Sequence, residues 1–259
     1  MGVSVRPGAV RLVLVGVAAG LLSGMFGIGG GTIVVPALVL WLGMPTKLSA
    51  GTSVAAILPT AIVGATSYAL QGQVNWVAAA CLAGGIIVGA QGGSLMLHRL
   101  PVVAIQWCFM VFLLVVIVSL WFVVPQRDAR IDLTLLSGAL LVLTGVVTGL
   151  LAGILGVGGG IVVVPVLMFF FGSSDLVAKG TSLLMMIPGS VSGTAGNLRR
   201  GNVDLRAAVW IGVAACACVP LGTFLAVGVD PFVSNVAFSL YLTIILGRMV
   251  VRRWRTGRE

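Results

Sequence analysis

Two stretches of the chain share one unusual pattern: GMFGIGGGTIVVPALVLWLG at Gly24–Gly43 and GILGVGGGIVVVPVLMFFFG at Gly153–Gly172. Each begins like an apolar helix, meets four glycines within five positions, and becomes apolar again around a proline. Glycine weakens a helix because its backbone is unusually free. The pattern therefore predicts an apolar helix that breaks at the same place in two copies.

The composition places both stretches in a membrane. Of the 259 residues, 59% are hydrophobic and 8% are charged, whereas soluble domains carry about 25% charged residues. Long intervals such as 133–174 and 207–229 hold no charge at all, and apolar stretches of about 18 residues or more indicate helices that span a bilayer. The sequence predicts an all-α polytopic membrane protein, with membrane lipid as its surrounding partner.

The charges and polar residues exclude several classes of function. The net charge of +9 does not indicate nucleic acid, because five of the fifteen basic residues lie in the tail after Gly247, as in a cytoplasmic end beside anionic headgroups. We find no catalytic set and no metal-ligand spacing, and the four cysteines are scattered. We therefore expect no enzyme, cofactor or metal. The lack of a carboxylate in the middle of a segment disfavours a cation carrier.

A shift of the sequence by 129 residues aligns the chain with itself without a gap. Between Gly20 and Asn75, 20 of 56 positions are then identical, and the glycines and prolines of the two quoted stretches coincide. Many secondary transporters are built from such repeated halves. We expect one integral membrane domain with a first half at residues 1–125 and a second at 126–259.

Each half holds five apolar segments, of which the second is only 13 residues long and too short to cross a bilayer comfortably. The segments lie near 10–28, 31–43, 49–70, 75–97 and 102–125, and near 133–156, 160–172, 178–198, 205–227 and 231–250.

Two topologies fit these segments. If each half makes five crossings, the halves are inverted, and the positive-inside rule puts both termini in the cytoplasm. If the first two segments of each half form one broken span, each half makes four crossings and the halves are parallel. We favour inversion, because glycine loops that enter from opposite faces can meet at the midplane.

The glycine runs suggest an anion site. Backbone that is not helical is tolerated at membrane depth only where protein buries it or water reaches it, so the runs indicate a broken or re-entrant helix pair. The helix that follows each run presents unpaired N–H groups and the positive end of its dipole, which favour an anion. The alternative is that the glycines only allow close helix packing. The candidate binding residues are Gly29, Gly30, Gly31, Gly158, Gly159 and Gly160.

A duplicated Gly-Thr-Ser motif adds four hydroxyl groups, and one amide is a further candidate. Thr52 and Ser53 align with Thr181 and Ser182; we expect these hydroxyls to donate to an anion, or else to cap a helix. Asn197, which aligns with Tyr68, is a polar amide in a membrane helix and a further candidate. Two lysines just before the motifs, Lys47 and Lys179, are expected at the membrane interface; the alternative is that they draw anions into the entrance.

The paired GIGGG-x4-P and GVGGG-x4-P motifs, each followed by Gly-Thr-Ser, resemble the sulfite exporter TauE/SafE family of permeases. The resemblance covers roughly residues 10–250. It implies a carrier in the inner membrane of a bacterium or archaeon that moves small sulfur-containing anions such as sulfite, thiosulfate or sulfonated organic acids, usually outward. The residues that match the family's motifs are Pro36, Pro165 and the glycines at 27, 29–31, 156 and 158–160. A passive anion channel and a membrane scaffold stay open as alternative functions. Assembly into a homo-oligomer also stays open.

Overall fold

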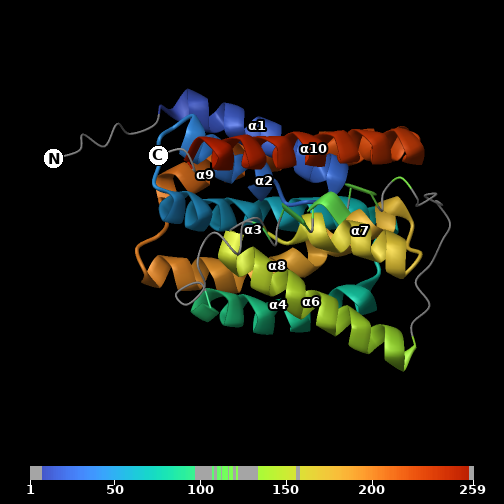
Figure 1. Ribbon diagram of the computed structural model, residues 1–259. Helices are drawn as coiled ribbons and strands as arrows, with labels where there is room; N and C mark the ends of the chain where they lie inside the picture. The colour runs from blue at the N-terminus through green and yellow to red at the C-terminus, as the bar shows by residue number, and fades with distance from the viewer. Residues whose placement is uncertain are drawn as a thin grey trace.

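The computed structural model describes residues 8–96, 107, 110–111, 113–115, 117–118, 121, 134–155 and 158–256. The regular structure of these residues is α-helical, and most helices run along one common axis (Figure 1). The helices are α1 (Ala9–Phe26), α2 (Gly31–Leu40), α3 (Thr46–Leu70), α4 (Trp76–Met96), α6 (Leu135–Leu155), α7 (Gly160–Phe170), α8 (Asp175–Arg199), α9 (Leu205–Gly228) and α10 (Pro231–Thr256).

These helices fall on the expected segments and confirm the all-α membrane fold. Five of them are long and apolar enough to span a bilayer, namely α1, α3, α6, α9 and α10. The two short segments form short helices, with 10 residues in α2 and 11 in α7. The expected segment 102–125 lies mostly outside the described residues, and Gly156, Arg99, Arg127 and Arg130 lie wholly outside them.

Glycine breaks the chain where the sequence predicted. Helix α1 ends at Phe26, and Gly27, Gly29 and Gly30 then take φ values of 69°, 72° and 70° before α2 begins. Gly158 and Gly159 take φ values of 83° and 82° before α7. Residues with a side chain rarely adopt these left-handed conformations, so the glycines are what lets two helices meet at a sharp turn inside the molecule.

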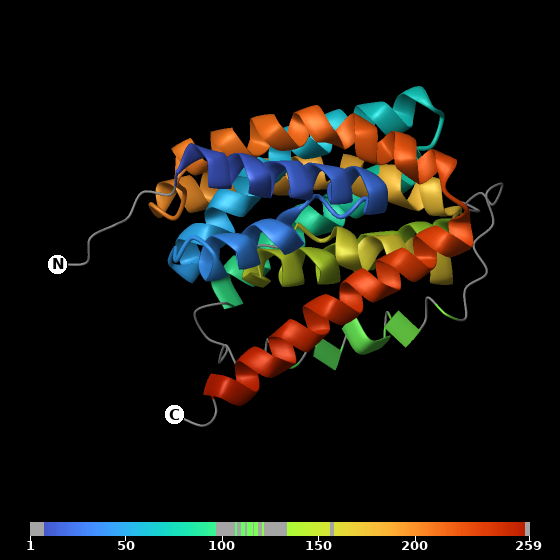
Figure 2. The same cartoon turned by 90° about the horizontal axis from the view of Figure 1, so that it is seen from above.

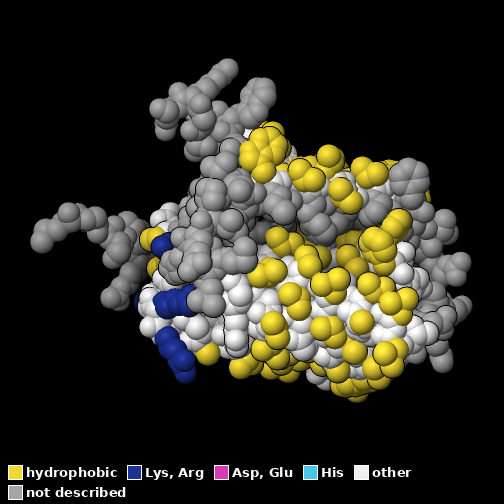
Figure 3. Space-filling model, turned by 60° about the horizontal axis from the view of Figure 1, so that its bottom comes forward, with side chains coloured by type: hydrophobic (Ala, Val, Ile, Leu, Met, Phe, Trp, Pro, Cys, Tyr) yellow, Lys and Arg dark blue, Asp and Glu magenta, His cyan; other side chains and the backbone are white. Residues whose placement is uncertain are grey.

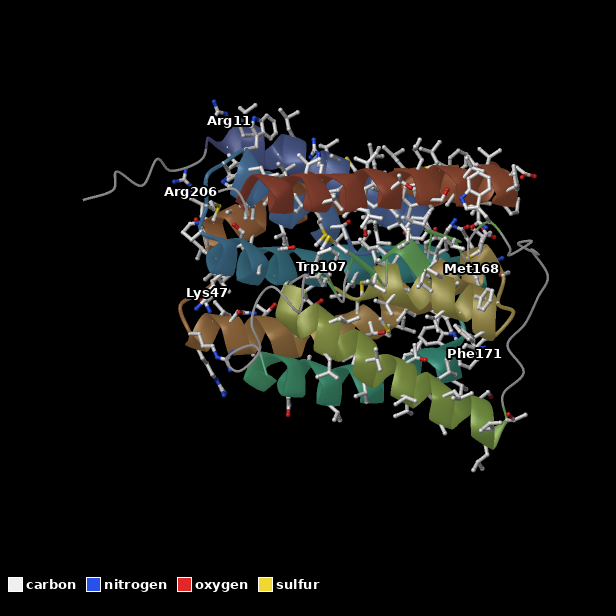
Figure 4. The ribbon with its side chains drawn as sticks, in the orientation of Figure 1. Arg11, Lys47, Trp107, Met168, Phe171 and Arg206 are labelled. Carbon is white, nitrogen blue, oxygen red and sulfur yellow. The ribbon has the colours of Figure 1, made fainter. Side chains whose placement is uncertain are left out.

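Each glycine turn joins a long helix to a short one that runs back toward the end where the long helix began. Helix α1 begins at one end of the molecule (Figures 1 and 2). Lys47, in the first turn of α3 after α2, lies at that same end, whereas Phe171, which follows α7, lies at the opposite end (Figure 4). The helix pairs α1–α2 and α6–α7 are therefore re-entrant hairpins that enter from opposite ends, and the short helices do not cross.

The two halves are inverted, as the contacts between α3 and α8 show. The hydroxyl of Thr52, near the start of α3, accepts a hydrogen bond of 2.9 Å from the N–H of Asp204, which follows α8. Thr181, near the start of α8, accepts one of 3.0 Å from Asn75, which follows α3. Equivalent helices thus run antiparallel, so parallel halves with four crossings each are excluded. The expected five crossings per half are wrong as well, because α2 and α7, with 10 and 11 residues, are too short to cross.

Other glycines serve close packing between the halves. A Cβ atom built on Gly20 of α1 would lie 2.4 Å from the carbonyl oxygen of Ala215 in α9. The equivalent Gly149 of α6 would place its Cβ 2.5 Å from the carbonyl oxygen of Ile86 in α4. The first helix of each half therefore packs, backbone against backbone, on the fourth helix of the other half, as small residues allow in membranes.

The surface of the described residues suits a bilayer. Large apolar side chains are exposed along the helices, for example Val213 at 65% and Phe224 at 75% in α9, and Figure 3 shows exposed apolar side chains spread over one face. Lys and Arg side chains gather at one end in Figure 3, where Figure 4 labels Arg11, Lys47 and Arg206. An apolar belt with a basic end is typical of a multi-pass membrane protein.

Two neighbouring glycines of α4 test the packing. A Cβ on Gly85 would lie 2.2 Å from the carbonyl oxygen of Val142, whereas a Cβ on Gly84 meets no atom within 4 Å. We predict that Gly85→Ala destabilises the fold by about 1–3 kcal/mol because α4 and α6 must move apart. Thermal unfolding in detergent measures this effect. Gly84→Ala is the matched control and should leave the melting temperature unchanged or raise it; equal losses for the two variants would contradict the packing.

Candidate functional site

The first glycine loop (Gly27–Gly31) and the second glycine loop (Gly158–Gly160) meet inside the molecule. A Cβ built on Gly160 would lie 2.7 Å from the carbonyl oxygen of Gly27 and 2.7 Å from the Cα of Ile28. Gly27, Ile28 and Gly160 are buried. The hairpins that enter from opposite ends therefore touch at their tips.

Each glycine loop leads into the N-terminus of a short helix. The first recorded bonds of α2 run from Ile33 and Val34 N–H to Gly30 O, and those of α7 from Val162 and Val163 N–H to Gly159 O. Neither helix has an acidic residue in its first turn or a side chain that caps it. The earlier N–H groups of a helix have no acceptor within it, so two helix ends with partial positive charge lie near one centre.

Two apolar side chains fill the space between the loops, and we call Ile57 and Met186 the central apolar pair. They are 129 residues apart, so they occupy equivalent positions in α3 and α8, and both are 1% exposed. The Cβ position of Gly29 lies 2.6 Å from Met186 Sδ and 3.2 Å from Ile57 Cγ2, and that of Gly158 lies 3.0 Å from Ile57 Cδ1. The structure is thus closed at its centre.

The Gly-Thr-Ser motifs lie inside α3 and α8, so they do not cap these helices, whose N-caps are Pro45 and Ser174. A Cβ on Gly51 would lie 2.0 Å from Asn202 O, and one on the equivalent Gly180 would lie 2.2 Å from Gln73 O. With the two threonine bonds described above, each motif clamps the turn that follows the other half's helix. Sequence reasoning missed this structural role.

The two motif serines lie one helical turn before the central apolar pair and on its face of each helix. Ser182 donates a hydrogen bond of 3.0 Å to Gly27 O in the first glycine loop. Ser53 is fully buried, and its hydroxyl has no hydrogen-bond partner. A buried hydroxyl without a partner is unfavourable by about 1–3 kcal/mol, so Ser53 is available for a ligand.

Asn197 is not brought to the glycine loops. Its amide donates a 2.9 Å hydrogen bond to Gly193 O within α8, and it lies eleven residues beyond Met186, or about 16 Å along the helix. Its repeat equivalent, Tyr68, is fully buried and donates a 2.6 Å hydrogen bond to Gly24 O. A role for Asn197 in binding stays a prediction.

Sequence reasoning missed a hydroxyl beside the second glycine loop. The Cβ position of Gly159 lies 2.6 Å from Thr148 Cγ2, and the Thr148 hydroxyl is buried without a partner. At the equivalent place in the first half, the Cβ position of Gly30 lies 3.1 Å from that of Ala19. The signal in the sequence is a hydroxyl residue in an apolar helix at a position where the other repeat has alanine.

A buried ion pair was also missed. Lys179 Nζ lies 3.2 Å from Asp175 Oδ2 and 2.8 Å from the hydroxyl of Ser234 in α10, and the two charged side chains are 4% and 1% exposed. We had expected Lys179 at the membrane interface; the expectation is wrong because α10 and Gly27 cover it. Within the described residues, no group of three or more His, Cys, Asp or Glu could hold a metal ion.

Comparison with known proteins identifies the family. The profile of the family described as Sulfite exporter TauE/SafE matches residues 2–120 and again residues 141–259, once for each half. The chain therefore belongs to this family and is a multi-pass membrane transporter. No solved structure matches the chain.

Several curated proteins are similar to the chain. The "Probable membrane transporter protein YdhB" of Bacillus subtilis is 27% identical over 196 residues, which cover 74% of this chain and 80% of YdhB. The "Probable membrane transporter protein MJ0441" of Methanocaldococcus jannaschii is 29% identical over 169 residues, 60% of each chain. A "Probable membrane transporter protein" of Haemophilus influenzae is 33% identical over 164 residues, again 60% of each chain. These descriptions name transport and no substrate.

The Ser53 hydroxyl distinguishes binding from packing. We predict that Ser53→Ala keeps or raises the melting temperature, because it removes a buried hydroxyl that has no protein partner. If that hydroxyl donates to an anion, the KM for the anion should rise about tenfold, the usual loss for one hydrogen bond to a charge.

The matched control is Ser49→Ala, one turn earlier in α3. Ser49 is also fully buried, but its hydroxyl bonds to Met44 O within the protein. Flux measurements on both variants should show a raised KM for Ser53→Ala alone. An unchanged KM in Ser53→Ala, with a lower melting temperature, would assign Ser53 to packing.

Proposed function

We propose that the protein carries small sulfur-containing oxyanions, such as sulfite, thiosulfate or organosulfonates, through a site between the two glycine loops. The observation that carries the proposal is the meeting of two uncapped helix N-termini at the tips of opposed hairpins. The family description supports sulfite-like cargo and outward transport.

The chemistry of the loops suits a compact oxyanion. Backbone N–H groups at a helix N-terminus donate to oxyanion oxygens, and a residue without Cβ lets the anion approach the backbone. Ser53 and Thr148 have hydroxyls without protein partners that can donate to the remaining oxygens. The proposed binding set is Gly29, Gly30, Gly31, Thr52, Ser53, Thr148, Gly158, Gly159, Gly160, Thr181 and Ser182, with Asn197 as a contact made in another state of the cycle.

A carrier suits the closed centre better than a channel does. A channel needs a continuous polar path, whereas Ile57 and Met186 are buried between the loops. In a carrier with inverted repeats, the halves exchange conformations and expose one central site to each side in turn. The central apolar pair then acts as a barrier that separates the two sides when no anion is bound.

Flux in proteoliposomes tests the function. We expect the purified protein to move sulfite, thiosulfate or a small sulfonate at least tenfold faster than chloride, with saturation and with counterflow of labelled against unlabelled anion. Saturation and counterflow are expected because each anion must wait for a conformational change. Flux that rises linearly with anion concentration would support a channel, and the absence of flux for every oxyanion would refute the proposal.

We further propose that both termini face the cytoplasm, because the exposed basic residues Arg11, Lys47 and Arg206 lie at the end where α1 begins (Figure 4). Gln71 and Arg200 are repeat-equivalent and exposed. We predict that a cysteine at Gln71 reacts with an impermeant thiol reagent in intact cells and that one at Arg200 reacts only after lysis. A variant without the four native cysteines serves as background. Reaction of Arg200→Cys in intact cells would reverse the orientation.

A further inference from the structure

We propose that the Asp175–Lys179 pair is a second anion station, at which an oxyanion replaces the Asp175 carboxylate on Lys179 while Asp175 takes up a proton. This inference rests on the proposed function and adds its coupling: one proton would accompany each anion through this station. It also places one point of the anion's path outside the central site, at the Asp175–Lys179 pair.

The contacts around the pair define a built site. Lys179 Nζ contacts Asp175 Oδ2 at 3.2 Å and Ser234 Oγ at 2.8 Å, so α8 and α10 both contribute. The other carboxylate oxygen, Asp175 Oδ1, is buried and has no hydrogen-bond partner. The carboxylate is therefore held through only one of its two oxygens. An oxyanion that accepts more hydrogen bonds here can compete with the carboxylate for Lys179.

The unfavourable burial of an unpaired charge explains why proton uptake would accompany anion binding at this pair. A buried charge without a partner is strongly unfavourable, so removing one member of a buried pair destabilises the other. Once an oxyanion neutralises Lys179, the Asp175 carboxylate loses its cation and becomes neutral by binding a proton from water. The ammonium group keeps its three protons throughout. For a monovalent anion, the station gains one negative and one positive charge, so its net charge does not change.

The station is connected to the first glycine loop. A Cβ on Gly27 would lie 2.6 Å from the Cα of Lys179, and Ser182, on the same helix, bonds to Gly27 O. An anion released from the loops toward the end where α8 begins therefore passes next to Lys179.

The pair breaks the symmetry of the repeat. The residues that align with Asp175 and Lys179 are Thr46 and Ala50, which carry no charge. The glycine loops and the Gly-Thr-Ser motifs are duplicated, so they treat the two ends of the path alike. A charged pair on one side only is a feature that can give transport a direction and a coupling ion.

Other titratable groups that face the pair are few among the described residues. Tyr68 on α3 lies within electrostatic reach of Asp175, and Tyr241 on α10 bonds to Thr32; tyrosine hydroxyls are neutral near neutral pH. Asp230, just before α10, is exposed and accepts a bond from Phe232 N–H. The described parts of α1 and α7 that lie at this end add no titratable side chain. Asp175 is thus the carboxylate that the exchange requires.

The test measures protons moved per sulfite in proteoliposomes, with a pH-sensitive dye inside and labelled sulfite outside. We expect Asp175→Asn to move about one proton fewer per sulfite than the wild type, because the amide cannot take up a proton. Comparing variants removes the proton that bisulfite carries itself. Asp230→Asn, an exposed carboxylate at the same end, is the matched control and should keep the wild-type ratio.

A second variant covers the case in which Asp175→Asn does not fold. The double variant Asp175→Leu/Lys179→Met replaces the pair by apolar groups of similar size, which often preserves or raises stability. We expect it to fold, by its melting temperature, and to lose at least 90% of sulfite flux. An unchanged proton ratio in Asp175→Asn, or wild-type flux in the double variant, would make the pair only structural and leave the proposed function standing. A wild type that moves no sulfite would instead refute the function.

Discussion

The antiparallel clamp between α3 and α8 is the constraint on which the rest of the structure depends. Gly51 and Gly180 let each helix approach the turn after the other, and Thr52 and Thr181 each bond to a backbone N–H of that turn. The clamp fixes the register of the two halves in opposite orientations. In that register the hairpins enter from opposite ends, the glycine loops touch, and Ile57 and Met186 meet between them.

Glycine serves two different purposes in this fold, and the backbone angles separate them. Several glycines of α1, α4 and α6 are helical and allow carbonyl oxygens of a neighbouring helix to approach where a Cβ would collide, as at Gly20 and Gly149. In the loops, glycines with positive φ, such as Gly30 and Gly159, stop a helix at membrane depth. The packing interpretation is confirmed at the helical glycines, whereas the site interpretation stays a prediction for the loop glycines. The loop glycines precede the two helix N-termini at which we propose that the anion binds.

The sequence predicted what depends on local pattern and on the repeat. The 129-residue offset gave the two halves, the glycine run gave the break, and the short length of α2 and α7 gave the re-entrant hairpins. Long-range contacts could not be predicted in this way. Lys179 looked interfacial because its burial comes from α10 and from Gly27. Ile57 and Met186 look like any apolar residue of a membrane helix, and the structural use of Thr52 requires the other half.

The central claim is that an anion binds between the two glycine loops, and the most direct measurement is crystallographic. Selenite has the shape and charge of sulfite, and its selenium can be located by anomalous X-ray diffraction from crystals of the protein grown with the anion. The account predicts a selenium peak between the first turns of α2 and α7, within hydrogen-bond reach of backbone N–H groups near Gly30 and Gly159. Selenium bound only at the basic end of the molecule, with the space between the loops still filled by Ile57 and Met186, would contradict it.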